Sequence, residues 1–116
     1  MSQLFAVGSE RRDGESGVVT VSGEVDMYTA PQLKECMLDL IDGGARRIVI
    51  DLSAVTFIDS TALGVLIGGV RRLHGADGAM ALVVTSRPVE RVLSITGLDR
   101  VFSIHATLDE ALAALA

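Results

Sequence analysis

Residues 47–73 read RIVIDLSAVTFIDSTALGVLIGGVRRL, and this stretch decides the fold of the chain. Its opening residues, Arg47–Leu52, form a nearly continuous apolar run, which predicts a central β-strand covered on both faces. From Ala62 onward, apolar or small residues recur at offsets of 3, 4, 7, 8 and 11, the spacing of one face of an α-helix. The polar residues Asp59–Thr61 lie at the seam, where the strand is expected to give way to the helix.

The chain ahead of this stretch predicts a hairpin and a helix. Leu4–Val7 and Val18–Ser22 are strand candidates, and valines alternate with polar residues in the second of them. The link between them is short, polar and rich in turn residues, so we expect them to pair as an antiparallel edge hairpin. Thr29 and Gln32 have the spacing of a capping box, which predicts a helix that stops at Gly43–Gly44.

The chain beyond it predicts two further strand and helix pairs. Ala81–Val84 is a second buried strand candidate, and a short helix is expected over residues 86–93, ahead of a glycine. Val101–Ile104 is the last strand candidate. Thr107 and Glu110 repeat the spacing of a capping box, and they predict a final helix.

These elements predict a single α/β domain over residues 1–116. After the hairpin, helices and strands alternate with short links, an order typical of parallel strands joined by right-handed crossovers. We therefore expect a mixed, mostly parallel sheet of about five strands with about four helices and an antiparallel hairpin at its N-terminal edge. Periodicity does not predict the order of the strands.

The composition limits which partners and which cellular compartment are expected. The chain has 116 residues and a net charge of −5, so neither nucleic acid nor an anionic membrane is expected as its main partner. No apolar run is long enough to span a bilayer, and the N-terminal residues lack the pattern of a secretion signal. The single cysteine, Cys36, fits a reducing cytosol. We expect a cytoplasmic protein that is a monomer or a weak dimer.

Enzymatic and metal chemistry find little support in the residues. The glycines of a Gly-x-Ser-x-Gly elbow are missing around Ser60, and only His74 and His105 could serve as bases. Neither these histidines nor Cys36 has the spacing of metal ligands. No phosphate-binding glycine loop is present either. We expect no catalytic residues, no cofactor and no metal.

A receiver domain is a further alternative, because Asp51 lies near the end of the central strand, where a phosphoacceptor aspartate would stand. That chemistry also requires an early acidic pair and a lysine late in the chain. The chain lacks the acidic pair, and its single lysine, Lys34, lies on the first predicted helix. Cys36 lies on the apolar face of the same helix, which favours a core position, although redox control through it stays open.

Ser60 has two possible roles at the seam. A serine at a helix start commonly caps the helix, but Asp59 is at least as good a cap, so the hydroxyls of Ser60 and Thr61 are not needed for that role. Glycines within the helix cost stability, so each needs a reason. Gly69 lies on the apolar face and predicts close packing, whereas Gly64 and Gly68 mark a neighbouring strip where another surface could approach.

Three segments resemble one known family. They are VSGEVDMYTAPQL at residues 21–33, IVIDLSAVTFIDSTALGVLIG at 48–68 and ALVVTSRPVERVLSITGLDRVFSI at 81–104. Together they resemble the anti-sigma factor antagonists, stand-alone members of the STAS family, whose domain is shared with the cytoplasmic tails of sulfate transporters. The resemblance implies a mixed sheet with helices wrapped along it. It also implies a phosphorylation switch: a serine kinase that is itself an anti-sigma factor adds the phosphate, and a phosphatase removes it.

The resemblance places the phosphoacceptor on Ser60, with Asp59 and Asp26 as acidic neighbours. Thr61 stands where the family commonly has a second serine, which keeps Thr61 as the less favoured acceptor, and Ala62 stands where glycine is common. In the unmodified state the protein is expected to bind the anti-sigma factor and release a sigma factor. The implied partner-binding residues are Asp26, Asp59, Ser60, Thr61, Leu63 and Gly64.

Two other functions stay open. The chain could be a subunit of a larger signalling assembly built from the same domain, or a module that binds a small ligand such as a nucleotide or a lipid.

Overall fold

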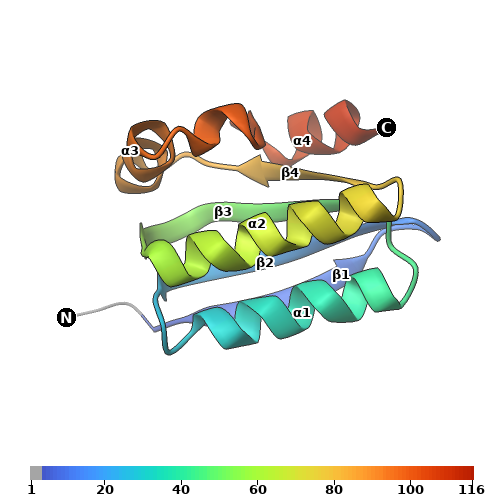
Figure 1. The fold of residues 1–116 in the computed structure, drawn as a ribbon, viewed down its shortest axis with the longest axis horizontal. Coiled ribbons are helices and arrows are strands. Elements are labelled where there is room, and N and C mark those ends of the chain that lie inside the picture. The colour runs from blue at the N-terminus through green and yellow to red at the C-terminus, as the bar shows by residue number, and fades with distance from the viewer. Residues whose placement is uncertain (1–3) are drawn as a thin grey trace.

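The computed structural model describes residues 4–116, which form one five-stranded sheet flanked by helices (Figure 1). The strands are β1 (Ala6–Arg11), β2 (Ser16–Val25), β3 (Arg47–Ile58), β4 (Ala79–Val83) and β5 (Ser103–His105). The helices are α1 (Ala30–Asp42), α2 (Ser60–Gly75), α3 (Arg87–Ile95) and α4 (Leu108–Leu115), with a short 3-10 helix at Leu98–Arg100.

The strands lie in the order β1-β2-β3-β4-β5. β1 pairs antiparallel with β2, and every other neighbouring pair is parallel, so the predicted mixed sheet and edge hairpin are confirmed. The first three residues of the predicted domain lie outside the described residues.

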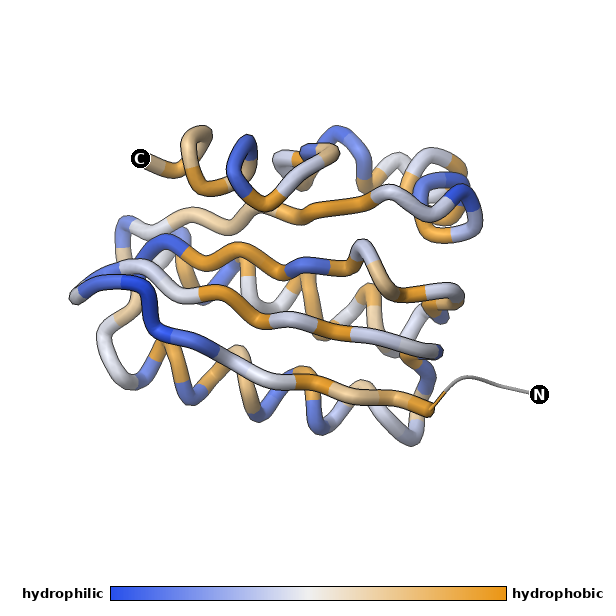
Figure 2. Tube along the Cα trace, turned by 180° about the vertical axis from the view of Figure 1, so that it is seen from behind, coloured by the Kyte–Doolittle hydropathy of each residue, from blue (hydrophilic) through white to orange (hydrophobic). Residues whose placement is uncertain are grey.

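Two separate cores hold the helices to the sheet. The larger core joins one face of the sheet to α1 and α2, which lie side by side in Figure 1, and it also takes in Val89 and Leu93 of α3. The smaller core lies on the other face, where Ala111 of α4 packs against Val49 and Val83. Seen from behind, α4 lies alongside β4, while β1 and β2 lie in front of α1 and α2 (Figure 2). Val19 and Val21 of β2 are buried in the larger core and Thr20 is exposed, as the alternation predicted, whereas Val18 is buried in the smaller core on the opposite face.

Strands β1, β2 and β3 are all longer than predicted, and their pairing with one another explains why. β3 continues past Leu52 to Ile58 because β2 pairs with it as far as Val25 and Ile58, although β4 leaves it after Asp51. Exposed polar residues such as Ser53 and Thr56 interrupt this second half, so no apolar run marks it as a strand. β1 starts at Ala6, later than predicted, but it extends to Arg11, which pairs with Gly17. Most of the polar segment that was expected to link the two strands therefore belongs to the strands themselves.

The predicted caps have mixed outcomes. Asp59 accepts a hydrogen bond from a backbone N–H in the first turn of α2, which confirms it as a cap, and Ser86 does the same for α3, at the start of the helix expected there. Thr107 accepts from the Glu110 N–H at 3.1 Å, but the Glu110 carboxylate accepts from the Ala106 N–H rather than closing the box. The capping box predicted at Thr29 is wrong, because the Thr29 side chain makes no cap hydrogen bond to α1.

The turn between β1 and β2 is held by Asp13. Its Oδ1 accepts from the backbone N–H groups of Glu15 and Ser16, each at 2.8 Å. These two hydrogen bonds favour the ionised carboxylate, and they lower the pKa of Asp13 below its ordinary value of 3.8. Because the folded-state pKa is depressed, the stabilisation is present above pH 3.8 and is lost as the pH falls through the folded-state pKa.

We expect Asp13→Ala to unfold at a lower temperature than the parent protein near neutral pH. The gap between the two melting temperatures should shrink once the pH drops below 3.8, because the parent then loses the same ionised acceptor. Thermal unfolding followed by circular dichroism across this range measures the gap. Asp13→Asn is the matched control, since it keeps an acceptor oxygen but cannot ionise. A difference in melting temperature that stays constant down to the lowest pH would contradict the stabilising role of the ionised Asp13 carboxylate.

Candidate functional site

The candidate site lies where β2 and β3 end together. Val25 and Ile58 are register partners, and the Asp59 N–H donates to the Val25 carbonyl at 3.1 Å. Because the two strands are parallel, Asp26 leaves β2 at the same sheet edge at which Asp59 leaves β3. The predicted placement of Asp26 beside the seam is therefore confirmed.

Asp59 alone caps α2. It has extended backbone dihedrals, and its Oδ1 accepts from the Ala62 N–H at 3.0 Å. Its carbonyl accepts from the Leu63 N–H at 3.1 Å, the first hydrogen bond of the helix. Ser60 and Thr61 follow in the first turn, and both are exposed. Neither hydroxyl makes a hydrogen bond to another group of residues 4–116, so both are available to a partner.

The rest of α2 has two faces. The buried face contains Leu63, Leu66, Gly69, Val70 and Leu73. A side chain at Gly69 would collide with the sulfur of Met37, which confirms the close packing predicted there. Gly64 and Gly68 are exposed, and a side chain at either would meet nothing within 4 Å, so the second predicted strip is open to solvent.

One predicted contact residue does not fit the expected surface. Leu63 has only 7% of its surface exposed, because it belongs to the main core between α2 and the sheet. It follows the helical period of the buried face, three residues ahead of Leu66. Leu63 therefore supports the first turn of α2 from below and has little surface to offer a partner.

Asp26 is half-buried, and its carboxylate is already engaged. Its Oδ1 accepts from the N–H groups of Tyr28 at 2.9 Å and Thr29 at 3.1 Å. These bonds fold the segment that leads from β2 into α1. Asp26 thus contributes negative charge at the edge and also fixes a turn, a role that the sequence did not reveal.

An open groove of about 440 Å³ lies between α1 and α2. Thr61, Gly64 and Gly68 form one side of it, and Lys34 contributes from α1. Arg72 at its far end is exposed and pairs with Asp42 at 2.6 Å. The charged lining groups are exposed, so the groove contains no buried polar group that would select a small ligand.

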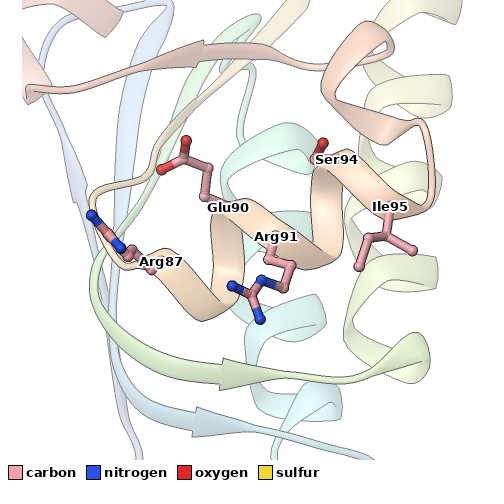
Figure 3. Close-up of a pocket in the computed structure, with 5 residues that line it drawn as sticks. All are labelled: Arg87, Glu90, Arg91, Ser94 and Ile95. Atoms are coloured by element: carbon pink, nitrogen blue, oxygen red, sulfur yellow. The ribbon is translucent and has the colours of Figure 1, made fainter.

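A second hollow is formed by α3 alone (Figure 3). Arg91 and Ile95 point to one side of the helix and Glu90 and Ser94 to the other. A hollow lined by a single helix is an exposed helix face, and nothing here gathers groups from separate elements.

The two histidines considered for other chemistry lie away from the seam. His74 is near the far end of α2, roughly 20 Å from Ser60 at 1.5 Å per residue. His105 lies on β5, where its Nε2 contacts the Ser103 hydroxyl at 2.6 Å. The Cys36 thiol is half-buried, and burial together with Asp39 and Glu35 raises its pKa, which disfavours the reactive thiolate.

Two further features of residues 4–116 concern metal ligands and long apolar helices. Among these residues, no cluster of three or more His, Cys, Asp or Glu side chains could hold a metal ion. None of their helices is both long enough and apolar enough to cross a membrane.

The sheet and the seam define a small α/β domain that presents hydroxyl groups beside two carboxylates at one helix N-terminus. Residues 9–111 match the sequence model of the STAS domain, and the chain belongs to that family. This confirms the family indicated by the three sequence segments.

Known members of the family are similar along most of the chain. The anti-sigma-B factor antagonist of Staphylococcus aureus is 33% identical over 87 residues, which cover 75% of this chain and 81% of that protein. The crystal structure of an anti-sigma factor antagonist from Mycobacterium paratuberculosis superposes with a TM-score of 0.88 at 37% identity, over 97% of this chain and 94% of the other. The anti-sigma factor antagonist SpoIIAA in its unphosphorylated form gives a TM-score of 0.80 at 26% identity, over 92% and 93%.

Proposed function

We propose that this protein is an anti-sigma factor antagonist whose affinity for an anti-sigma factor is switched by phosphorylation of Ser60. In the unmodified state it binds the anti-sigma factor and releases a sigma factor. The observation that carries the proposal is the state of the Ser60 hydroxyl. It is exposed and free of hydrogen bonds within residues 4–116, on a helix turn that Asp59 already caps.

This geometry suits a kinase substrate. The first turn of α2 is fixed below by Leu63 and capped by Asp59, so a kinase can reach the hydroxyl without unfolding the domain. Thr61 is exposed as well, but it lines the groove between α1 and α2, whereas Ser60 does not. This difference favours Ser60 as the acceptor.

A phosphate at this position is compatible with the fold. Phosphorylation adds about −1.5 to −2 charges. The positive end of the α2 dipole favours negative charge, and its exposed first turn has room for the group. The domain itself therefore tolerates the modification, and the penalty has to arise at an interface.

The interface penalty is electrostatic. Asp59 adjoins Ser60 in sequence, and Asp26 leaves the neighbouring strand at the same edge, so the phosphate enters a region that is already acidic. An acidic group of a partner brought within roughly 5 Å of one added charge costs about 3 kcal/mol at an effective dielectric of about 20. Half of that amount lowers the affinity about tenfold. A phosphate buried at the interface without a cationic partner would cost more.

The proposed partners are a serine kinase that is itself the anti-sigma factor, and a serine phosphatase that restores the hydroxyl. The chain acts as their substrate and ligand rather than as an enzyme, and the proposed setting is the cytoplasm. The antagonists from Staphylococcus aureus and Mycobacterium paratuberculosis, both at least 30% identical to this chain, support the regulatory role, since both are named as antagonists of an anti-sigma factor.

Incubation with an anti-sigma factor kinase of the source organism and ATP tests the acceptor. We expect one phosphate on Ser60 by intact mass and peptide mapping, no phosphate on Ser60→Ala, and normal incorporation into the matched control Thr61→Ala. Phosphate on Thr61 would move the switch by one residue, and no incorporation would contradict the proposed regulation. Stable high-order assembly of the purified protein, or tight binding of a nucleotide or lipid, would favour the two other functions.

A further inference from the structure

The segment that joins β2 to α1 exposes two large apolar side chains in succession. Met27 is 60% exposed and Tyr28 is 80% exposed. Single exposed apolar residues are common on soluble proteins and need no explanation. These two differ because they are adjacent, and because the turn that carries them is held by hydrogen bonds at both ends.

Asp26 and Thr29 hold the turn through reciprocal hydrogen bonds. Asp26 Oδ1 accepts from the backbone N–H groups of Tyr28 and Thr29. In the opposite direction, Thr29 Oγ1 accepts from the Asp26 N–H at 2.9 Å and donates to the Glu24 carbonyl at 3.1 Å. The Thr29 hydroxyl thus faces back toward β2 instead of capping α1, which is why the predicted capping box is absent.

The turn is also tied to the seam that carries Ser60. Asp26 directly follows Val25, and the Val25 carbonyl accepts from the Asp59 N–H at 3.1 Å. The first residue of the turn is therefore adjacent to the acceptor of this hydrogen bond, and the donor, Asp59, directly precedes Ser60. The parallel pairing of β2 and β3 fixes the turn and the helix start at one edge of the sheet.

We infer that the Asp26–Thr29 turn is a preorganised recognition element for the same anti-sigma factor that acts on Ser60, with Tyr28 as its anchor and Thr29 as a positioning residue. This inference rests on the proposed function for the identity of the partner. An aromatic side chain held on a rigid turn buries a large area with little loss of conformational freedom. The complementary feature of the partner is an apolar pocket that admits the ring, with a polar group at its mouth for the phenol hydroxyl.

The anchor is tested by measuring the affinity of unphosphorylated protein for the anti-sigma factor kinase by titration calorimetry. We expect Tyr28→Ala to weaken binding about 10- to 30-fold, a loss that reaches the threshold of an interface hot spot, and Tyr28→Phe to stay within about threefold. Val101→Ala is the control: Val101 is 53% exposed and precedes β5, three strands away from β2. Binding by Tyr28→Ala within twofold of the parent protein would overturn the anchor.

The positioning role is tested by removing the Thr29 hydroxyl. Thr29→Val keeps the shape of the side chain, and we expect it to weaken binding about fivefold, with Thr29→Ser restoring it, because serine keeps the hydroxyl. In the Tyr28→Ala background, Thr29→Val should cause no further loss, since its effect passes through Tyr28. An equal loss in both backgrounds, or no rescue by serine, would overturn the positioning role, whatever the change in melting temperature.

The same assay separates this inference from the proposed switch. If Tyr28→Ala weakens binding but a negative charge at Ser60 does not, the recognition role of the Asp26–Thr29 turn is supported and the phosphorylation switch is contradicted. If the charge at Ser60 weakens binding but Tyr28→Ala does not, the recognition role of the turn is contradicted and the phosphorylation switch is supported. If the parent protein does not bind the anti-sigma factor kinase, both fail.

Discussion

Ser60→Asp is expected to weaken binding to the anti-sigma factor at least about tenfold while leaving the melting temperature within about 2 °C of the parent protein. The affinity falls because a permanent negative charge is added beside Asp59, at an edge to which Asp26 also contributes. Stability is preserved because Ser60 is exposed and lies at the positive end of the α2 dipole, which favours an anion. Titration calorimetry and thermal unfolding measure the two quantities separately.

Ser60→Asn is the matched control, since asparagine has the shape of aspartate without its charge. We expect Ser60→Asn to bind within a few-fold of the parent protein. Equal losses for both variants would mean that the interface rejects the size of the side chain, and the electrostatic account would be wrong.

Leu66→Ala and Gly68→Ala are expected to change stability in opposite directions, although both lie on α2. Leu66 is fully buried in the main core, so truncation should lower the free energy of unfolding by about 2–5 kcal/mol through lost burial and the remaining cavity. Gly68 is exposed with open space around it, so alanine should raise that free energy by up to about 1 kcal/mol through better helix propensity.

Chemical denaturation of the two variants and the parent protein measures both changes. The expected difference in sign follows from the two faces of α2: one packs on the sheet, and the other leaves Ser60, Gly64 and Gly68 open. A loss of stability in Gly68→Ala would mean that the open strip is covered, and the separation of the two faces would be contradicted.

The fold was largely predictable where local pattern and tertiary contact agree. The helical stripe from Ala62 predicted the buried face of α2, including Gly69, because the spacing of 3.6 residues per turn is set by the backbone alone. Asp59 was a predictable cap for a similar reason, since its bond to the Ala62 N–H is local. The exposed hydroxyl of Ser60 follows directly from that cap.

Features that depend on a distant partner could not be predicted. The second half of β3 is a strand because β2 pairs with it, and no apolar run marks residues such as Ser53 and Thr56. Thr29 had the right spacing for a capping box, but the Glu24 carbonyl and the Asp26 N–H, brought together by the end of β2, compete for its hydroxyl. The predicted stripe did not include Leu63, which the resemblance suggested as a contact, yet Leu63 lies three residues before Leu66 and is buried with it.

The most direct test compares the affinities of two forms of the same protein for the anti-sigma factor kinase: unmodified, and phosphorylated stoichiometrically by that kinase and freed of it. We expect tight binding by the first form, a loss of at least about tenfold in the second, and recovery after phosphatase treatment. Equal affinities for a protein shown by mapping to carry its phosphate on Ser60 would contradict the switch.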